Sequence, residues 1–91
     1  MEHRDDCIRL PSAATIHTAL KSVLDDSRVS VGMYPLISKY ADKTRNRHDV
    51  GVIVTHAIGV YSESFPDQVA TRLYLLKDSF VQAIISASRP A

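Results

Sequence analysis

The pattern that decides the fold lies in residues 65–87, which read FPDQVATRLYLLKDSFVQAIISA. Apolar side chains recur here at intervals of four and three residues, the spacing of a heptad seam on one helix face. The seam consists of Val69, Leu73, Leu76, Phe80, Ala83 and Ala87. Ser64 is placed to cap the first turn, and Pro66 suits that turn because no amide hydrogen is needed there. We therefore predict one long C-terminal helix over residues 65–87.

Further apolar residues widen the seam of this helix. They are Ala70, Tyr74, Leu75, Val81, Ile84 and Ile85. A helix that packs on a single neighbour needs an apolar face of only about 100°. A helix that is apolar around most of its circumference is either central in its own fold or in contact with another molecule. The alternative to a partner is a compact monomer in which residues 1–10 and 28–34 fold over this helix.

We expect the surplus apolar surface to be covered by a partner protein, with a homodimer as the first candidate. A large exposed apolar patch is unusual on a monomer, and a two-fold interface is self-complementary. Tyr61 and Tyr74 lie on the two most apolar segments, and tyrosine is common at interface hot spots. The residues predicted to bind the partner are Tyr61, Leu73, Tyr74, Leu76, Phe80, Val81 and Ile84.

A second helix is predicted over residues 12–26. Ser12 can cap its start, and the apolar residues that follow are spaced by three and four. They are Ile16, Ala19, Leu20, Val23 and Leu24. Asp25 and Asp26 indicate that the helix stops there, because the helix dipole is negative at the C-terminus. We expect residues 1–10, which precede this helix, to form a flexible arm.

The stretch from residue 28 to residue 49 is less regular. Residues 28–34 are compatible with a short strand, or with a break at Gly32 and Tyr34, which precedes a proline. Pro35 suits the first turn of a helix, and we expect a short helix over residues 35–44. The polar residues 43–49 are predicted to form a loop, with Asp49 available to cap the segment that follows.

Residues 50–61 fit both a helix and a strand. The helical reading aligns Val50, Ile53, Val54, Ala57, Ile58 and Tyr61 on one stripe. The β-branched residues, together with Gly51 and Gly59, favour a strand instead. Because no second strong strand is present, a strand here would leave its backbone groups unpaired, and we favour the helix. The expectation is an all-α domain over residues 1–91, with three to four helices.

Size and composition restrict the class of protein. The chain has 91 residues, of which 45% are hydrophobic, and its single cysteine, Cys7, excludes an internal disulfide. The 11 Lys and Arg residues nearly balance the 10 Asp and Glu residues, so the basic excess typical of nucleic-acid binding is missing. The start of the chain is charged and no apolar run is long enough to span a bilayer, so we expect a cytoplasmic protein without a membrane partner.

No recognised pattern of catalytic or metal-binding residues occurs. His3 and Cys7 are four residues apart, but a structural zinc site needs four ligands. Serine, histidine and aspartate are present without the glycine-rich elbow that frames a nucleophile. A phosphate loop and a dinucleotide fingerprint are also missing. We therefore expect no enzymatic activity, no cofactor and no metal.

One basic cluster supports an alternative function. It consists of Lys39, Lys43, Arg45, Arg47 and His48. Such a cluster could contact phosphates, and the alternative is a small DNA-binding transcriptional regulator. A helix-turn-helix protein needs polar side chains on its recognition helix, whereas the segment after this cluster offers valines and isoleucine. Nucleic acid is therefore the less favoured partner.

The small size, the few helices and the broad apolar surface from Val69 to Ile85 resemble the QslA-like antiactivators of bacterial quorum sensing. The resemblance implies a dimeric regulatory protein that binds the ligand-binding domain of a LuxR-type transcription regulator. It further implies that this binding blocks dimerisation or DNA binding of the regulator. No signature motif anchors the likeness, so no functional residue is carried over.

Overall fold

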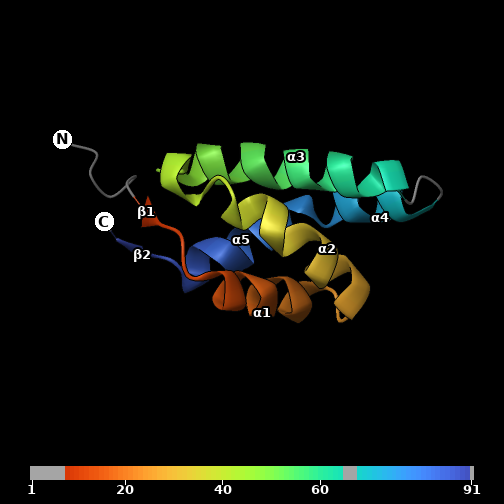
Figure 1. Ribbon diagram of the computed structural model, residues 1–91, viewed down its shortest axis with the longest axis horizontal. Helices are drawn as coiled ribbons and strands as arrows, with labels where there is room; N and C mark the ends of the chain where they lie inside the picture. Colours follow the sequence, from red (N-terminus) through yellow and green to blue (C-terminus); the bar gives the residue numbers. More distant parts are fainter. Residues whose placement is uncertain (1–7, 65–67, 91) are drawn as a thin grey trace.

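The protein is an all-α domain, as expected from its sequence. The computed structural model describes residues 8–64 and 68–90. These residues form five α-helices, one short 3-10 helix and two very short strands (Figure 1). In chain order the elements are β1 (Ile8–Arg9), α1 (Ala13–Val23), α2 (Ser27–Ser38), η2 (Ala41–Lys43), α3 (Arg47–Ser64), α4 (Gln68–Leu75), α5 (Lys77–Ala87) and β2 (Arg89–Pro90).

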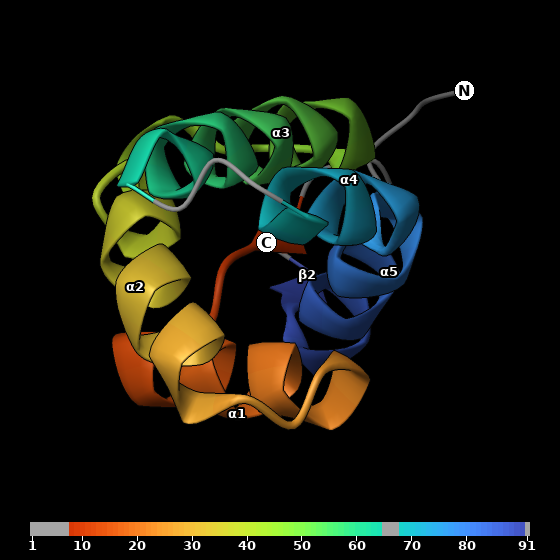
Figure 2. The same ribbon diagram turned by 90° about the vertical axis from the view of Figure 1, so that its right-hand side faces the viewer.

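The helices form a ring around one apolar core. Figure 2 shows α3 facing α1 across the interior, with α2 on one side and α4 and α5 on the other. Neighbouring helices of the ring pack on one another: α1 contacts α2 and α5, and α3 contacts α2, α4 and α5. Phe80 of α5 is the largest fully buried side chain. The other large, fully buried apolar residues are Ile16, Leu20, Met33, Ile37, Val50, Val54, Ile58, Leu73 and Ile84.

The predicted continuous helix over residues 65–87 is wrong, because the structure divides it into α4 and α5. Leu76 separates the two helices with φ −94° and ψ 0°. Its amide is shared between the carbonyls of Arg72 and Leu73, a tightening typical of a helix end. The break turns α5 so that it contacts α1 as well as α3. The predicted start of this helix, including Pro66, lies outside the described residues.

Residues 27–38 form one helix, which corrects both predictions for this region. Neither a strand nor a break occurs at residues 28–34, and the helix expected over residues 35–44 ends at Ser38. Asp26 begins α2 by accepting a hydrogen bond from the Arg28 amide at 3.0 Å. Pro35 lies in the helix interior on an exposed position, and the helix lacks there the hydrogen bond to the Val31 carbonyl that another residue would donate.

The predictions for residues 12–26 and 50–61 are confirmed, with shifted ends. Ser12 caps α1 by accepting a hydrogen bond from the Thr15 amide at 3.3 Å. Helix α3 starts at Arg47, earlier than expected, because Asn46 accepts from the Asp49 amide at 2.9 Å. The Asp49 carboxylate accepts in turn from the Arg45 amide, also at 2.9 Å. The loop expected over residues 43–49 is therefore limited to the few residues between η2 and α3.

Residues 8–10 are docked, although they were expected to belong to a flexible arm. Strand β1 pairs antiparallel with β2, so that Ile8 faces Pro90 and Arg9 faces Arg89. The Ile8 amide also donates to the Arg45 carbonyl at 2.7 Å. Leu10 is buried in the core. These contacts hold both ends of the described chain beside the start of α3.

A helix that crosses a bilayer needs about 20 mostly apolar residues. Among the described residues, no helix combines sufficient length with sufficient apolar character to cross a membrane. Helix α3, the longest, has 18 residues and includes charged side chains at both ends.

Helices α2 and α3 approach closely where Gly32 faces the ring of Tyr61. A Cβ atom on Gly32 would lie 2.6 Å from Tyr61 Cδ1, far inside van der Waals contact. We therefore expect Gly32→Ala to destabilise the fold by about 1–3 kcal/mol, because overpacking outweighs the gain in helix propensity. Urea unfolding followed by circular dichroism measures the change.

Gly51 supplies the control for this prediction. A Cβ atom there would meet nothing within 4 Å. Gly51→Ala should therefore stabilise α3 by up to about 1 kcal/mol, the usual difference in helix propensity. Stabilisation by both substitutions would contradict the close approach of α2 and α3.

Tyr61 gives a second prediction, through its titration. Burial and the nearby Asp26 carboxylate raise the pKa of Tyr61 above its ordinary value of 10, and Arg28 opposes them. The folded state thus holds the phenol proton more tightly than the unfolded chain. The resulting contribution to stability is present below pH 10 and is lost as the pH rises through the folded pKa.

The ultraviolet absorbance of phenolate, taken as the difference between wild type and Tyr61→Phe, follows this ionisation. We expect its midpoint above pH 10, and a lower midpoint in Asp26→Asn, which removes the charge and retains a capping oxygen. A midpoint at or below pH 10 in the folded wild type would show that burial does not act on Tyr61 in this way.

Candidate functional site

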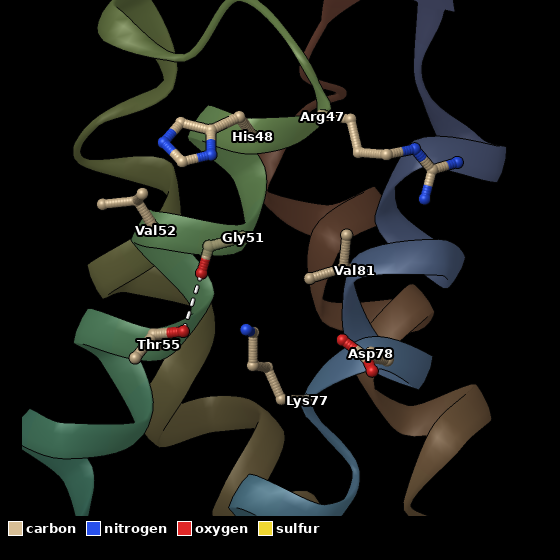
Figure 3. A pocket seen from close by; sticks show the side chains of 8 residues that line it. All are labelled: Arg47, His48, Gly51, Val52, Thr55, Lys77, Asp78 and Val81. Carbon is tan, nitrogen blue, oxygen red and sulfur yellow. Dashed lines mark hydrogen bonds between the residues drawn. The ribbon is translucent and has the colours of Figure 1, made fainter.

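A groove of about 410 Å³ lies between the first halves of α3 and α5 (Figure 3). It is open to solvent, and its volume is in the range of ordinary ligand sites. We call it the α3–α5 groove. Its lining residues are Arg47, His48, Gly51, Val52 and Thr55 from α3, and Lys77, Asp78 and Val81 from α5.

The floor of the groove is hollow and apolar. Gly51 places no side chain there, and a Cβ atom at this position would meet nothing within 4 Å. Val81 is buried beneath the groove, whereas Val52 remains exposed at its edge. The Thr55 hydroxyl donates to the Gly51 carbonyl at 2.8 Å, so its proton is already bonded to the backbone. The floor therefore offers room for an apolar side chain.

Three basic side chains and one acidic side chain surround this floor. Arg47 reaches across to α5, where its Nη2 donates to Gln82 Oε1 at 3.3 Å. Figure 3 shows the Lys77 amine directed from α5 into the space between the two helices, with His48 on the α3 side. Within the part of the chain that the structure describes, no ion pair joins Arg47 or Lys77 to a carboxylate. Asp78 is the single acidic residue of the lining.

The positions of Arg47 and Lys77 are unfavourable for the helices that carry them. Arg47 and His48 lie in the first turn of α3, and Lys77 lies in the first turn of α5. The helix dipole gives each of these ends a partial positive charge, so a basic side chain there is destabilising. Helix stability therefore does not explain the two cations Arg47 and Lys77. Each of the two first turns also carries an acidic residue, Asp49 in α3 and Asp78 in α5, so the groove lies among side chains of both charges.

Exposed apolar side chains stand beside the groove. Leu75 is 80% exposed and Tyr74 is 47% exposed, and both end α4 directly before the groove-lining part of α5. Val52 on α3 is 52% exposed. The Tyr74 hydroxyl extends over α3, because a Cβ atom on Gly59 would lie 3.5 Å from it. We call Val52, Tyr74 and Leu75 the apolar rim.

The structure places the seven residues predicted to bind a partner in different environments. Four of them, Leu73, Phe80, Val81 and Ile84, are buried in the core of the chain itself. Tyr61 and Leu76 are partly buried against that core. Tyr74 alone among the seven is exposed. The predicted set therefore does not form a surface patch, because the break at Leu76 lets α5 use its apolar face inside the fold.

The basic cluster of the sequence is divided as well. Arg47 and His48 line the α3–α5 groove, where they are joined by Lys77. Arg45 lines a different depression, with Ile8, Leu10 and Asp42 among its neighbours. Lys39 and Lys43 are exposed outside both. Sequence spacing did not indicate the pairing with Lys77, because that residue is thirty positions from Arg47 along the chain.

A serine–histidine pair joins α1 to α2. Ser30 Oγ and His17 Nε2 are 3.0 Å apart, and the His17 ring meets the edge of the Tyr34 ring at 5.3 Å. Ser30 is fully buried and its hydroxyl also bonds the Ser27 carbonyl at 3.2 Å. A neighbouring depression is lined by His17 and Tyr34 but not by Ser30. The pair therefore acts as a packing contact between helices, without an accessible nucleophile.

Metal ligands and known relatives give no further indication of function. The proposed pair His3 and Cys7 lies outside the described residues, and no group of three or more potential metal ligands occurs within them. No family model matches the sequence, and no curated protein or solved structure matches the chain. The α3–α5 groove and the apolar rim are therefore the features on which a functional proposal can rest.

Proposed function

We propose that the protein is a small helical regulatory protein that binds another protein through the apolar rim. The observation that carries this proposal is the exposure of two consecutive large apolar residues, Tyr74 and Leu75, at the end of α4. Val52 is a further exposed apolar side chain, on α3. Single exposed apolar residues are common, but a group of them beside a groove is typical of an interaction site.

The energetics of burial support this role for the rim. Covering an exposed leucine side chain contributes about 1.5–3 kcal/mol. A tyrosine adds a large ring and one hydroxyl, a combination that is enriched at interface hot spots. Leu75 makes little use of the core of its own fold, because most of its surface faces water. Its contribution is therefore available to a partner.

The more specific form of the proposal is an antiactivator of a LuxR-type transcription regulator. Its support is the all-α fold of a short chain, together with the apolar rim, which takes the place of the predicted seam from Val69 to Ile85. Such a protein would cover an apolar surface that the regulator needs for dimerisation or DNA binding. A second copy of the chain is the other occupant that the rim could accept, and it would make the protein a homodimer.

Direct DNA binding by residues 39–48 has less support. Arg47 and His48 line the α3–α5 groove and Arg45 lines another depression, whereas Lys39 and Lys43 lie outside both. The exposed side chain one turn into α3 is Val52, where a recognition helix would carry a polar residue. The nearly balanced charge of the chain also disfavours phosphate binding.

Substitution of Leu75 tests the proposal. The probe is the purified ligand-binding domain of a LuxR-type regulator, with light scattering to follow both this complex and self-association. Leu75→Asp should weaken the wild-type association at least about tenfold, because the apolar burial is lost. The fold should persist, since the residue is exposed.

Val31→Asp is the matched control. Val31 is 53% exposed, but it lies on α2, beside a different depression from the α3–α5 groove. Val31→Asp should therefore leave binding to the regulator domain and self-association unchanged. The proposal fails if wild type associates neither with the regulator nor with itself, or if Leu75→Asp behaves as wild type. Mobility of duplex DNA with the protein at low salt tests the alternative function.

A further inference from the structure

We propose that the α3–α5 groove binds an acidic amphipathic helix of the partner protein. One apolar side chain of that helix would enter the hollow above Gly51 and Val81, and its flanking carboxylates would meet Lys77 and Arg47. This inference rests on the proposed protein-binding function and adds the chemistry of the partner. It concerns the groove, which shares Val52 with the apolar rim but contains neither Tyr74 nor Leu75.

Charge complementarity identifies the occupant as acidic. Lys77 and Arg47 are permanent cations without an ion-pair partner among the described residues, and Arg47 bonds only a neutral glutamine. The first turns of α3 and α5 add partial positive charge at the same place. Carboxylates brought between the two helix starts would relieve the repulsion that each cation experiences in the free protein. The cations in the first turns of α3 and α5, which destabilise the free fold, would therefore strengthen binding of an acidic partner.

The hollow floor identifies the occupant as apolar as well. Gly51 leaves open space where any other residue would place a side chain, and the Val81 side chain points toward that space from α5 (Figure 3). The groove has a volume of about 410 Å³, enough for a leucine or phenylalanine side chain together with adjacent backbone. An amphipathic helix supplies both components, because residues three and four apart share one face.

A protein segment fits the groove better than a nucleic acid. Asp78 lies in the lining and would repel a phosphate backbone, which carries a charge at every nucleotide, whereas a peptide can direct its carboxylates to Lys77 and Arg47 and leave an uncharged or basic side chain beside Asp78. Val52, Tyr74 and Leu75 beside the groove would remain uncovered by a phosphate backbone. The chain also lacks a general basic excess, with 11 basic against 10 acidic residues.

The test uses a synthetic helical peptide of about 15 residues, the length at which isolated helices begin to be stable. It carries one leucine flanked by glutamates on the same face. Fluorescence anisotropy measures its binding to the full-length protein, beside an analogue with glutamine in place of glutamate. We expect the acidic peptide to bind at least about tenfold more tightly than the analogue, with an affinity that falls as salt rises.

Two variants assign this binding to the groove. Lys77→Glu reverses a groove charge and should weaken binding of the acidic peptide at least about tenfold. Gly51→Leu fills the hollow and should weaken both peptides, while the helix retains good propensity. Lys39→Glu is the control with the same change of net charge, because Lys39 is exposed outside the groove. Circular dichroism verifies that each variant is folded.

The outcomes separate this inference from the proposed function. The inference is overturned if wild type binds the acidic peptide no better than the glutamine analogue, or if Lys77→Glu binds it as wild type does. It is also overturned if duplex DNA binds in a Lys77-dependent manner and displaces the peptide, which would assign the groove to nucleic acid. In each case, loss of regulator binding or self-association in Leu75→Asp would still support the apolar rim as a protein-binding surface.

Discussion

The fold depends on the burial of Phe80 at the centre of the helical ring. Phe80, Leu73 and Ile84 are fully buried, and they come from the two helices that close the ring against α1 and α3. A helix that packs on two neighbours uses a wider apolar face than one that packs on a single neighbour. The large apolar surface of the C-terminal segment is therefore consumed mainly inside the chain. The large apolar side chains that stay exposed among the described residues are Tyr74 and Leu75 at the end of α4, Val52 on α3 and Val31 on α2.

The break at Leu76 links this core to the surface features. Because the chain turns there, α5 reaches α1, and the side chains just before the turn are left outside the core. Tyr74 and Leu75 precede the turn, and Lys77 follows it as the first residue of α5. The start of α5 then lies opposite the start of α3, and the absence of a side chain at Gly51 leaves the space between them open. The groove and the apolar rim thus arise from the same local geometry.

The sequence was sufficient to predict what local periodicity and capping control. The all-α class, the helix begun by Ser12 and the helical state of residues 50–61 followed from spacing, capping and the lack of a partner strand. The break at Leu76 was not predictable, because a heptad pattern continues through it and the reason lies in contacts with α1. Helix α2 was missed because Gly32 and Pro35 are normally breakers, yet Gly32 is required where the Tyr61 ring packs. Contacts between distant helices decide both features.

The same limitation explains why the groove could not be predicted. Arg47 and Lys77 line one groove only because α3 and α5 lie side by side, and nothing in their separate sequences indicates this. One local signal was present in the positions of Arg47 and Lys77. A basic residue in the first turn of a helix is unfavourable because of the helix dipole, whereas the last turn is favourable. Helices α3 and α5 each begin with a cation, Arg47 and Lys77, and both residues line the same groove. Each of these positions is unfavourable for its own helix. Sequences that depart from local stability in this concentrated way commonly do so at functional sites, which is the physical reason to look for the partner's carboxylates there.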